Sequence, residues 1–259
     1  MFFKFHKNFI INVWRKTVNT KKKNTQTNFY KKANALRLDN LYKEAVANYL
    51  NAILIDRNNA KSYYELGLCY KNLKKYSKAI KYLDIASKLK EDYYDAFFEL
   101  GICYQLEGEN CGAIKNFISA IQINPENPNA ILQLGISHEL CEEYDLALII
   151  YQKLIENSSG FLKAYEQKAM LLMKLNRYKE AVSLLGDVIK RNPDYYNAYA
   201  GIGVCFEKLG KFSQAQRYYR KFLTLKPFSD QTEFIKNRLY ELKINNNTKT
   251  GELHLKSIG

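Results

Sequence analysis

The feature that most constrains this chain is a repeat of 34 residues that runs from residue 26 to residue 229 without an insertion or deletion. Its six blocks are 26–59, 60–93, 94–127, 128–161, 162–195 and 196–229. Position 8 of the block is always glycine or alanine, and position 20 is always alanine, whereas positions 4 and 24 carry large, mostly aromatic residues. Tandem units of this length indicate a stacked repeat fold, because each unit buries its apolar face against the next. The two small columns are Ala33, Gly67, Gly101, Gly135, Ala169, Gly203 and Ala45, Ala79, Ala113, Ala147, Ala181, Ala215.

Each block contains two runs with the spacing of a helix face. Large residues at positions 4, 7 and 11 are followed, after a break near position 15, by apolar residues at positions 17, 20, 24 and 27. This pattern predicts two amphipathic helices joined by a short turn. Lys74 and Glu142 occupy the turn in two blocks, and we expect those two turns to be strained or differently shaped. The other four turns carry residues that tolerate a left-handed backbone, namely Asn40, Gly108, Asn176 and Gly210.

These columns resemble the tetratricopeptide repeat, and the resemblance covers residues 26–229. The proline that closes the repeat in that family stands here at Pro125, Pro193 and Pro227, and is absent from the other three block ends. The resemblance implies an all-α fold, a right-handed α-solenoid of six helix-turn-helix repeats.

The segments outside the repeats differ in character. Residues 230–244 are predicted to form a C-terminal capping helix, because Asp230 and Glu233 have the spacing of a capping box and an apolar stripe follows them. Residues 245–259 are polar and are expected to be a disordered tail. Residues 1–25 form a basic, partly amphipathic leader.

The residue types that carry most catalysis are scarce or scattered. Three of the five cysteines, Cys69, Cys103 and Cys205, fall at position 10 of their blocks, a small and buried place that suits a free thiol. No pair of cysteines has metal-ligand spacing, and no nucleophile–base pair or glycine-rich phosphate loop stands out. We therefore expect no enzyme activity, no metal and no cofactor.

The resemblance implies that the first helix of each repeat lines a concave groove, with positions 2, 5, 9, 12 and 13 pointing into it. The family usually carries an asparagine at position 9, but only Asn34 keeps it here, and apolar residues follow in the later blocks. An exposed apolar strip of this kind is typical of a partner site. Two alternatives are that these residues pack against the next helix, or that the N-terminal segment covers them. The predicted groove consists of Tyr30, Asn34, Tyr64, Leu68, Phe98, Ile102, Leu132, Ile136 and Met170, with a rim of Lys61, Glu65, Asp95, Glu99 and Glu139.

One specialised binding mode of the family can be tested on the residues. Co-chaperone members grip the C-terminal carboxylates of heat-shock proteins with basic residues and asparagines on three adjacent first helices. At the corresponding positions Asn34 matches, but Glu65, Asp95 and Glu99 are acidic and would repel a carboxylate. The carboxylate clamp is therefore absent.

The formal charge of +14 is concentrated near the N-terminus. Ten cations precede the first acidic residue, Asp39, so the repeats are nearly neutral and nucleic-acid binding is not expected of their groove. Phe2, Phe9 and Trp14 fall mostly on one side of a helical wheel and the cations on the other. This pattern is typical of a membrane-surface helix or an organelle-import sequence, but a cap on the first repeat explains it equally well.

Together these features predict a non-catalytic, cytoplasmic interaction scaffold or chaperone-like adaptor that holds an apolar helix or peptide in its groove. The alternatives are a peripheral membrane assembly factor that docks through residues 1–25, and a substrate-recognition subunit of a separate enzyme. The sequence leaves the oligomeric state open.

Overall fold

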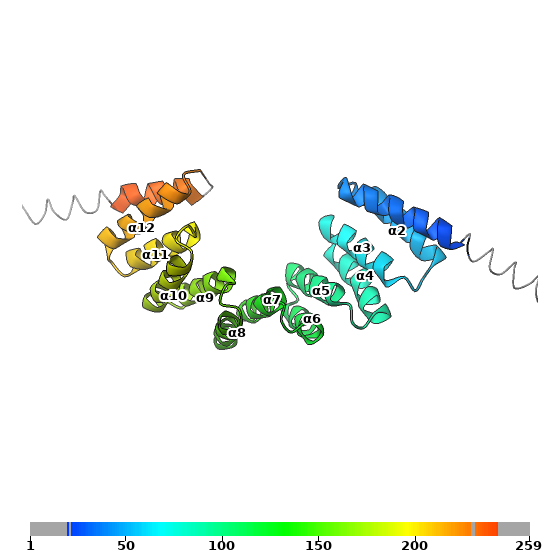
Figure 1. The fold of residues 1–259 in the computed structure, drawn as a ribbon, viewed down its shortest axis with the longest axis horizontal. Helices are drawn as coiled ribbons and strands as arrows, with labels where there is room; N and C mark the ends of the chain where they lie inside the picture. Colours follow the sequence, from blue (N-terminus) through cyan, green and yellow to red (C-terminus); the bar gives the residue numbers. More distant parts are fainter. Residues whose placement is uncertain (1–19, 21, 229–230, 243–259) are drawn as a thin grey trace, which may run out of the picture. The chain divides into compact units, whose positions relative to one another are not determined.

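The computed structural model describes residues 20, 22–228 and 231–242 (Figure 1). The chain divides into two compact units, residues 1–141 (unit 1) and residues 142–259 (unit 2). Most of the predicted leader lies outside the described residues, and its described part, residues 20 and 22–25, is helical. The predicted tail, residues 245–259, lies wholly outside them.

All regular structure in the described residues is helical. Unit 1 contains helical residues 22–38, α2 (Tyr42–Ile55), α3 (Ala60–Asn72), α4 (Tyr76–Leu89), α5 (Tyr94–Glu107), α6 (Asn110–Ile123) and α7 (Pro128–Leu140). Unit 2 contains α8 (Tyr144–Asn157), α9 (Leu162–Lys174), α10 (Tyr178–Arg191), α11 (Tyr196–Lys208), α12 (Phe212–Leu225) and helical residues 231–242. The predicted all-α class is confirmed.

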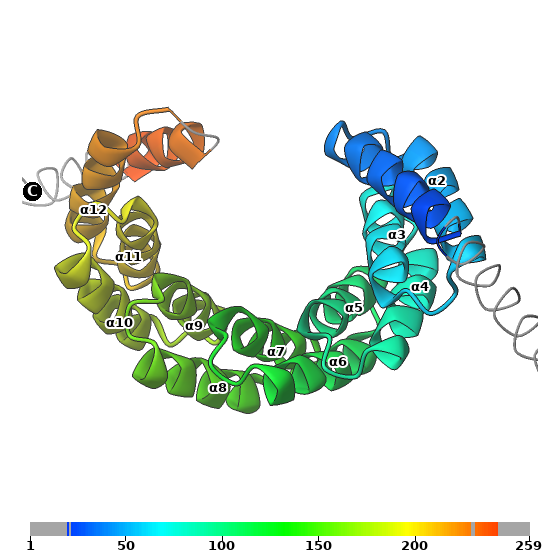
Figure 2. The ribbon, with the colours of Figure 1, turned by 45° about the vertical axis from the view of Figure 1, so that its right-hand side comes forward.

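Within each unit the helices pack in chain order as antiparallel pairs. In unit 1, α3 packs on α4 and α5 on α6, and the first helices of neighbouring blocks also touch, α3 with α5 and α5 with α7. Figure 2 shows α3, α5 and α7 along one side of unit 1 and α4 and α6 along the other; in unit 2, α9 and α11 lie opposite α10 and α12. We call these two sides the first-helix face and the second-helix face.

The small residue at position 8 makes room for the large residue at position 24. A Cβ atom placed on Gly101 would lie 2.5 Å from Cε1 of Phe117, whose side chain is fully buried. Gly67 stands in the same way against Leu83. The close approach of the two helices therefore depends on glycine wherever the position 24 side chain is directed at it.

All six turns between paired helices contain a residue with positive φ. Lys74 has φ of 56° and Glu142 has φ of 61°, close to the 60° of Asn40. Of the two alternatives expected for these turns, the different shape is wrong: both turns have the common shape, with a left-handed residue that is neither glycine nor asparagine. A left-handed backbone costs a non-glycine residue roughly 1–2 kcal/mol. The packing of the helix pair therefore holds each turn in the shape common to all six, although Lys74 and Glu142 would by themselves disfavour it.

Candidate functional site

An apolar strip crosses the first-helix face of unit 1. It is formed by half-buried side chains at positions 5 and 9 of successive blocks, which the 34-residue period places side by side on adjoining helices. The side chains of the apolar strip are Tyr64 and Leu68 on α3, Phe98 and Ile102 on α5, and Ile136 on α7.

Aromatic contacts fix the two largest members of the apolar strip. The ring of Phe98 stacks on that of Tyr94, with centroids 5.9 Å apart, and meets the buried ring of Phe117 edge-on at 5.8 Å. The ring of Tyr64 lies 5.1 Å from that of Tyr93, the residue just before α5. Because these rings are already packed, a partner would meet a pre-formed surface.

A series of polar contacts links neighbouring first helices. The residue at position 12 of one block reaches position 6 of the next, 28 residues on: Arg37 Nε lies 3.1 Å from Glu65 Oε2, and Lys71 Nζ donates to Glu99 Oε2 at 2.5 Å. In the following pair of blocks Gln105 donates to Ser137 Oγ at 2.9 Å and to the carbonyl of Gln133. We call these contacts the inter-repeat ladder.

The inter-repeat ladder changes the role of two predicted rim residues. Glu65 is buried, with 8% of its surface exposed, and burial raises the pKa of its carboxyl group although Arg37 and Lys61 oppose the shift. Glu99 is half-buried against Lys71. Both carboxylates are therefore occupied in joining repeats. Of the other predicted rim residues, Lys61 and Asp95 are exposed, and Glu139 is half-buried.

Two of the predicted groove residues, Leu132 and Asn34, are placed differently from the expectation. Leu132 is only 1% exposed, so it belongs to the core and cannot present a surface to a partner. Asn34 accepts a hydrogen bond from Tyr49 Oη at 2.5 Å, so its amide oxygen is used within the first block. Tyr30 carries Lys61 Nζ above its ring, 5.8 Å from the centroid. Met170 is 54% exposed but lies in unit 2.

The cysteines that were predicted to be buried free thiols are so. Burial raises the pKa of Cys69 and Cys103 to about 12 and that of Cys205 to about 11, which keeps all three protonated near neutral pH. Over residues 20, 22–228 and 231–242, no three histidine, cysteine or acidic side chains gather where they could hold a metal ion. None of the described helices is both long and apolar enough to cross a membrane.

A stack of helical hairpins with a pre-formed apolar strip defines the class of helical-repeat interaction scaffolds. Within that class the family is shown by sequence: profiles described as tetratricopeptide repeat match residues 60–93 and 167–230, and one described as TPR repeat matches residues 33–74. The chain is a tetratricopeptide repeat protein, as its columns predicted. A search of curated proteins found none that matches its sequence.

Solved structures agree with this assignment at the level of fold. The chain is similar to the C-terminal part of a TPR repeat-containing protein from Cytophaga hutchinsonii, with 21% identity over 76% of this chain and 78% of the other, at a TM-score of 0.65. It is similar to yeast Tom70, with 20% identity over 83% of this chain and 46% of the other, at a TM-score of 0.64. It is also similar to YrrB, a TPR protein with an unusual peptide-binding site, with 21% identity over 73% of this chain and 97% of YrrB, at a TM-score of 0.54.

Proposed function

We propose that this chain is a non-catalytic scaffold that binds an apolar segment of another protein on the apolar strip of unit 1. Tetratricopeptide repeat proteins are in general interaction scaffolds without catalytic activity, and YrrB offers a precedent for peptide binding on this fold. The observation that carries the proposal is the half-exposed row of Tyr64, Leu68, Phe98, Ile102 and Ile136 on three adjoining helices.

The inter-repeat ladder supports an apolar guest over a charged one. Lys71 and Glu99 neutralise each other beside Ile102, and Arg37 does the same for Glu65. A charged partner would have to compete with these pairs, whereas an apolar side chain gains roughly 25 cal/mol for each Å² that it removes from water. A helix with an apolar face, or an extended peptide with alternate apolar side chains, would suit such a row.

The test is an affinity capture from the native cell in which wild type and two variants are compared. Ile102→Asp places a carboxylate in the middle of the apolar strip and is expected to lose the partner, because docking would bury an unpaired charge. Ile118→Asp makes the same change on α6, at a side chain that is 42% exposed and outside the strip, and is expected to retain the partner.

Both variants must keep the helical circular dichroism of wild type, since the two side chains are partly exposed and neither change opens the core. The captured protein is then purified and its affinity for each variant is measured. A partner that binds Ile102→Asp as tightly as wild type would show that the apolar strip is not its site.

A further inference from the structure

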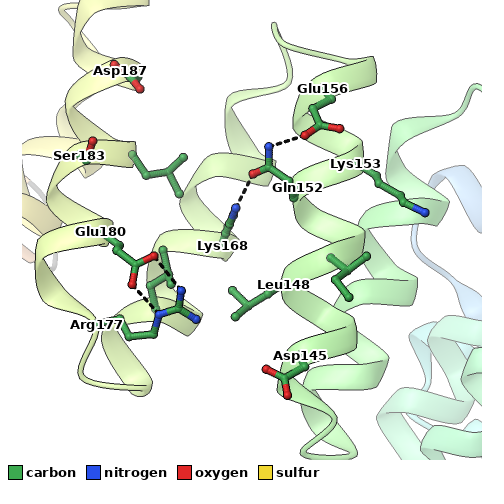
Figure 3. Close-up of a pocket in the computed structure, with 13 residues that line it drawn as sticks. Asp145, Leu148, Gln152, Lys153, Glu156, Lys168, Arg177, Glu180, Ser183 and Asp187 are labelled. Atoms are coloured by element: carbon green, nitrogen blue, oxygen red, sulfur yellow. Dashed lines mark hydrogen bonds and ion pairs between the residues drawn. The ribbon is translucent and has the colours of Figure 1, made fainter.

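A groove of about 830 Å³ lies on the second-helix face of unit 2, between α8 and α10, with α9 at its floor (Figure 3). Four aliphatic side chains line its apolar part, and Lys168 rises from α9 into its centre. This volume is within the range of sites that hold small molecules. The aliphatic side chains are Leu148 and Ile149 of α8, Leu172 of α9 and Leu184 of α10.

Lys168 departs from most of its column and, unlike the other lysine there, is half-buried. It stands at position 7 of its block, where the first block carries the exposed Lys32 and the second, third, fourth and sixth blocks carry Leu66, Leu100, Leu134 and Ile202. Burial lowers the pKa of the Lys168 ammonium group, as expected for a cation set among apolar side chains. Where a sequence departs from a local rule at a cost in stability, a functional role is a common reason.

The Lys168 ammonium group is bonded to a neutral oxygen. Its Nζ donates to Gln152 Oε1, and Gln152 Nε2 donates in turn to Glu156 Oε1 at 2.6 Å (Figure 3). Among the described residues, no carboxylate lies within ion-pair distance of Lys168. An ammonium group has three donors, and a half-buried one is best stabilised by an anion.

Most carboxylates around the groove are already bonded. Glu180 accepts from both Nε and Nη2 of Arg177 at 2.7 Å, and Asp187 pairs with Lys190 at 2.8 Å. Glu156 accepts from the neutral amide of Gln152. Lys168 therefore has no carboxylate as a direct neighbour, although the charges of Glu180 and Glu156 act on it from a longer distance. Glu180 and Asp187 are each paired with a cation, whereas Glu156 is bonded to a neutral group.

We propose that this groove binds a small aliphatic carboxylic acid, whose carboxylate pairs with Lys168 and whose hydrocarbon chain lies on Leu148, Ile149 and Leu184, with the buried Leu172 beneath them. The carboxylate supplies the anion that the ammonium group lacks, and the chain covers the exposed apolar wall. The site lies on the second-helix face of unit 2, so it does not rest on the apolar strip of unit 1.

The test uses hexanoate as the probe, with hexan-1-ol and hexylammonium as matched ligands of the same chain length. Each is titrated into the full chain, and binding is followed by NMR of methyl-labelled leucine and isoleucine. Hexanoate is expected to shift the methyl signals of Leu148, Ile149 and Leu184 and to bind about tenfold or more tightly than either matched ligand. Equal binding of all three, or no binding of hexanoate at any soluble concentration, would overturn the proposal.

Variants separate the cation from the apolar wall. Lys168→Leu, which restores the column, and Lys168→Gln are both expected to reduce hexanoate binding at least about tenfold. Gln152→Glu places an internal carboxylate beside Lys168 and is expected to weaken binding in the same way without removing the cation. Lys179→Leu removes an exposed lysine of α10 outside the groove and is the control. Retained hexanoate binding in both Lys168 variants would refute the role of Lys168.

A peptide is the other possible source of such a carboxylate. N-acetyl-Leu-Glu-Leu-amide presents a glutamate between two leucines, and its affinity is measured beside that of hexanoate. We expect hexanoate to bind and the peptide to bind more weakly. If only the peptide bound, the groove would be a protein-docking surface, and the small-acid proposal would be wrong.

Discussion

Gly101→Ala tests whether glycine at position 8 is required by the side chain at position 24. The added methyl carbon would lie 2.5, 2.6 and 2.7 Å from Cε1, Cζ and Cδ1 of Phe117. The ring is fully buried and is also held edge-on against Phe98. It therefore has little room to move away.

The magnitude follows from two opposed effects. Overpacking a core costs about 1–3 kcal/mol, and three ring atoms in conflict place this case near the upper end. Alanine in place of a mid-helix glycine returns roughly 0.5–1 kcal/mol. We expect Gly101→Ala to lower the free energy of unfolding by about 2 kcal/mol.

Gly186→Ala is the matched control. Gly186 is also inside a helix, α10, but a Cβ atom there would meet nothing within 4 Å. This variant is expected to gain about 0.5–1 kcal/mol. Urea unfolding of the full chain, followed by circular dichroism, compares the variants, and hydrogen exchange assigns the loss to α5 and α6, because repeat arrays need not unfold in one step.

A double variant tests the contact between residues 101 and 117 directly. Gly101→Ala with Phe117→Leu recreates the pair that the fifth block has, Ala169 with Leu185, both of them buried. It is expected to be more stable than Gly101→Ala alone. If Gly101→Ala stabilised the protein as Gly186→Ala does, the steric account would be wrong.

Three further predictions concern stability and thiol reactivity. Lys74→Gly should raise the unfolding free energy by about 0.5–1 kcal/mol, because it relieves a left-handed residue; unchanged urea midpoints would contradict this. Lys168→Leu should raise it by about 1 kcal/mol, since the lowered pKa of Lys168 means that its charge opposes folding at every pH below that pKa; a lower melting temperature would count against it. At pH 8, Cys111, which is exposed, should react rapidly with a thiol reagent, whereas Cys69, with a pKa of about 12, should react only on unfolding; equal rates would refute this.

The repeat columns were sufficient to predict the fold class, because the same type of residue recurs at the same packing position in all six blocks. They predicted the paired helices and the buried cysteines. They did not predict the shape of the Lys74 turn, since side-chain preference at one residue is weaker than the packing of two helices. They also did not show that the side chain at position 24 is what requires glycine at position 8. That requirement depends on the direction in which the large side chain points, which the columns do not give.

The site was less accessible to sequence analysis. Position 5 was expected to face a partner, but Leu132 is buried, because exposure at a column position depends on neighbouring side chains that differ from block to block. Glu65 and Glu99 were expected at a rim, but each forms an ion pair with a cation 28 residues earlier, Arg37 and Lys71. That 28-residue spacing could have been recognised in the sequence. Lys168 in a mostly aliphatic column was readable too, but Lys32 shares that column, and only the structure shows that Lys168 is half-buried in a groove.

The inter-repeat ladder also determines which repeats can be neighbours. Removing residues 60–93 would bring Arg37 to the place now held by Lys71, opposite Glu99, so a cation would still meet a carboxylate. Removing residues 94–127 would set Lys71 opposite Gln133 and leave its charge without an anion. The blocks therefore have similar helices but are not interchangeable in order. We expect the protein to fold when residues 60–93 are removed and to be destabilised when residues 94–127 are removed.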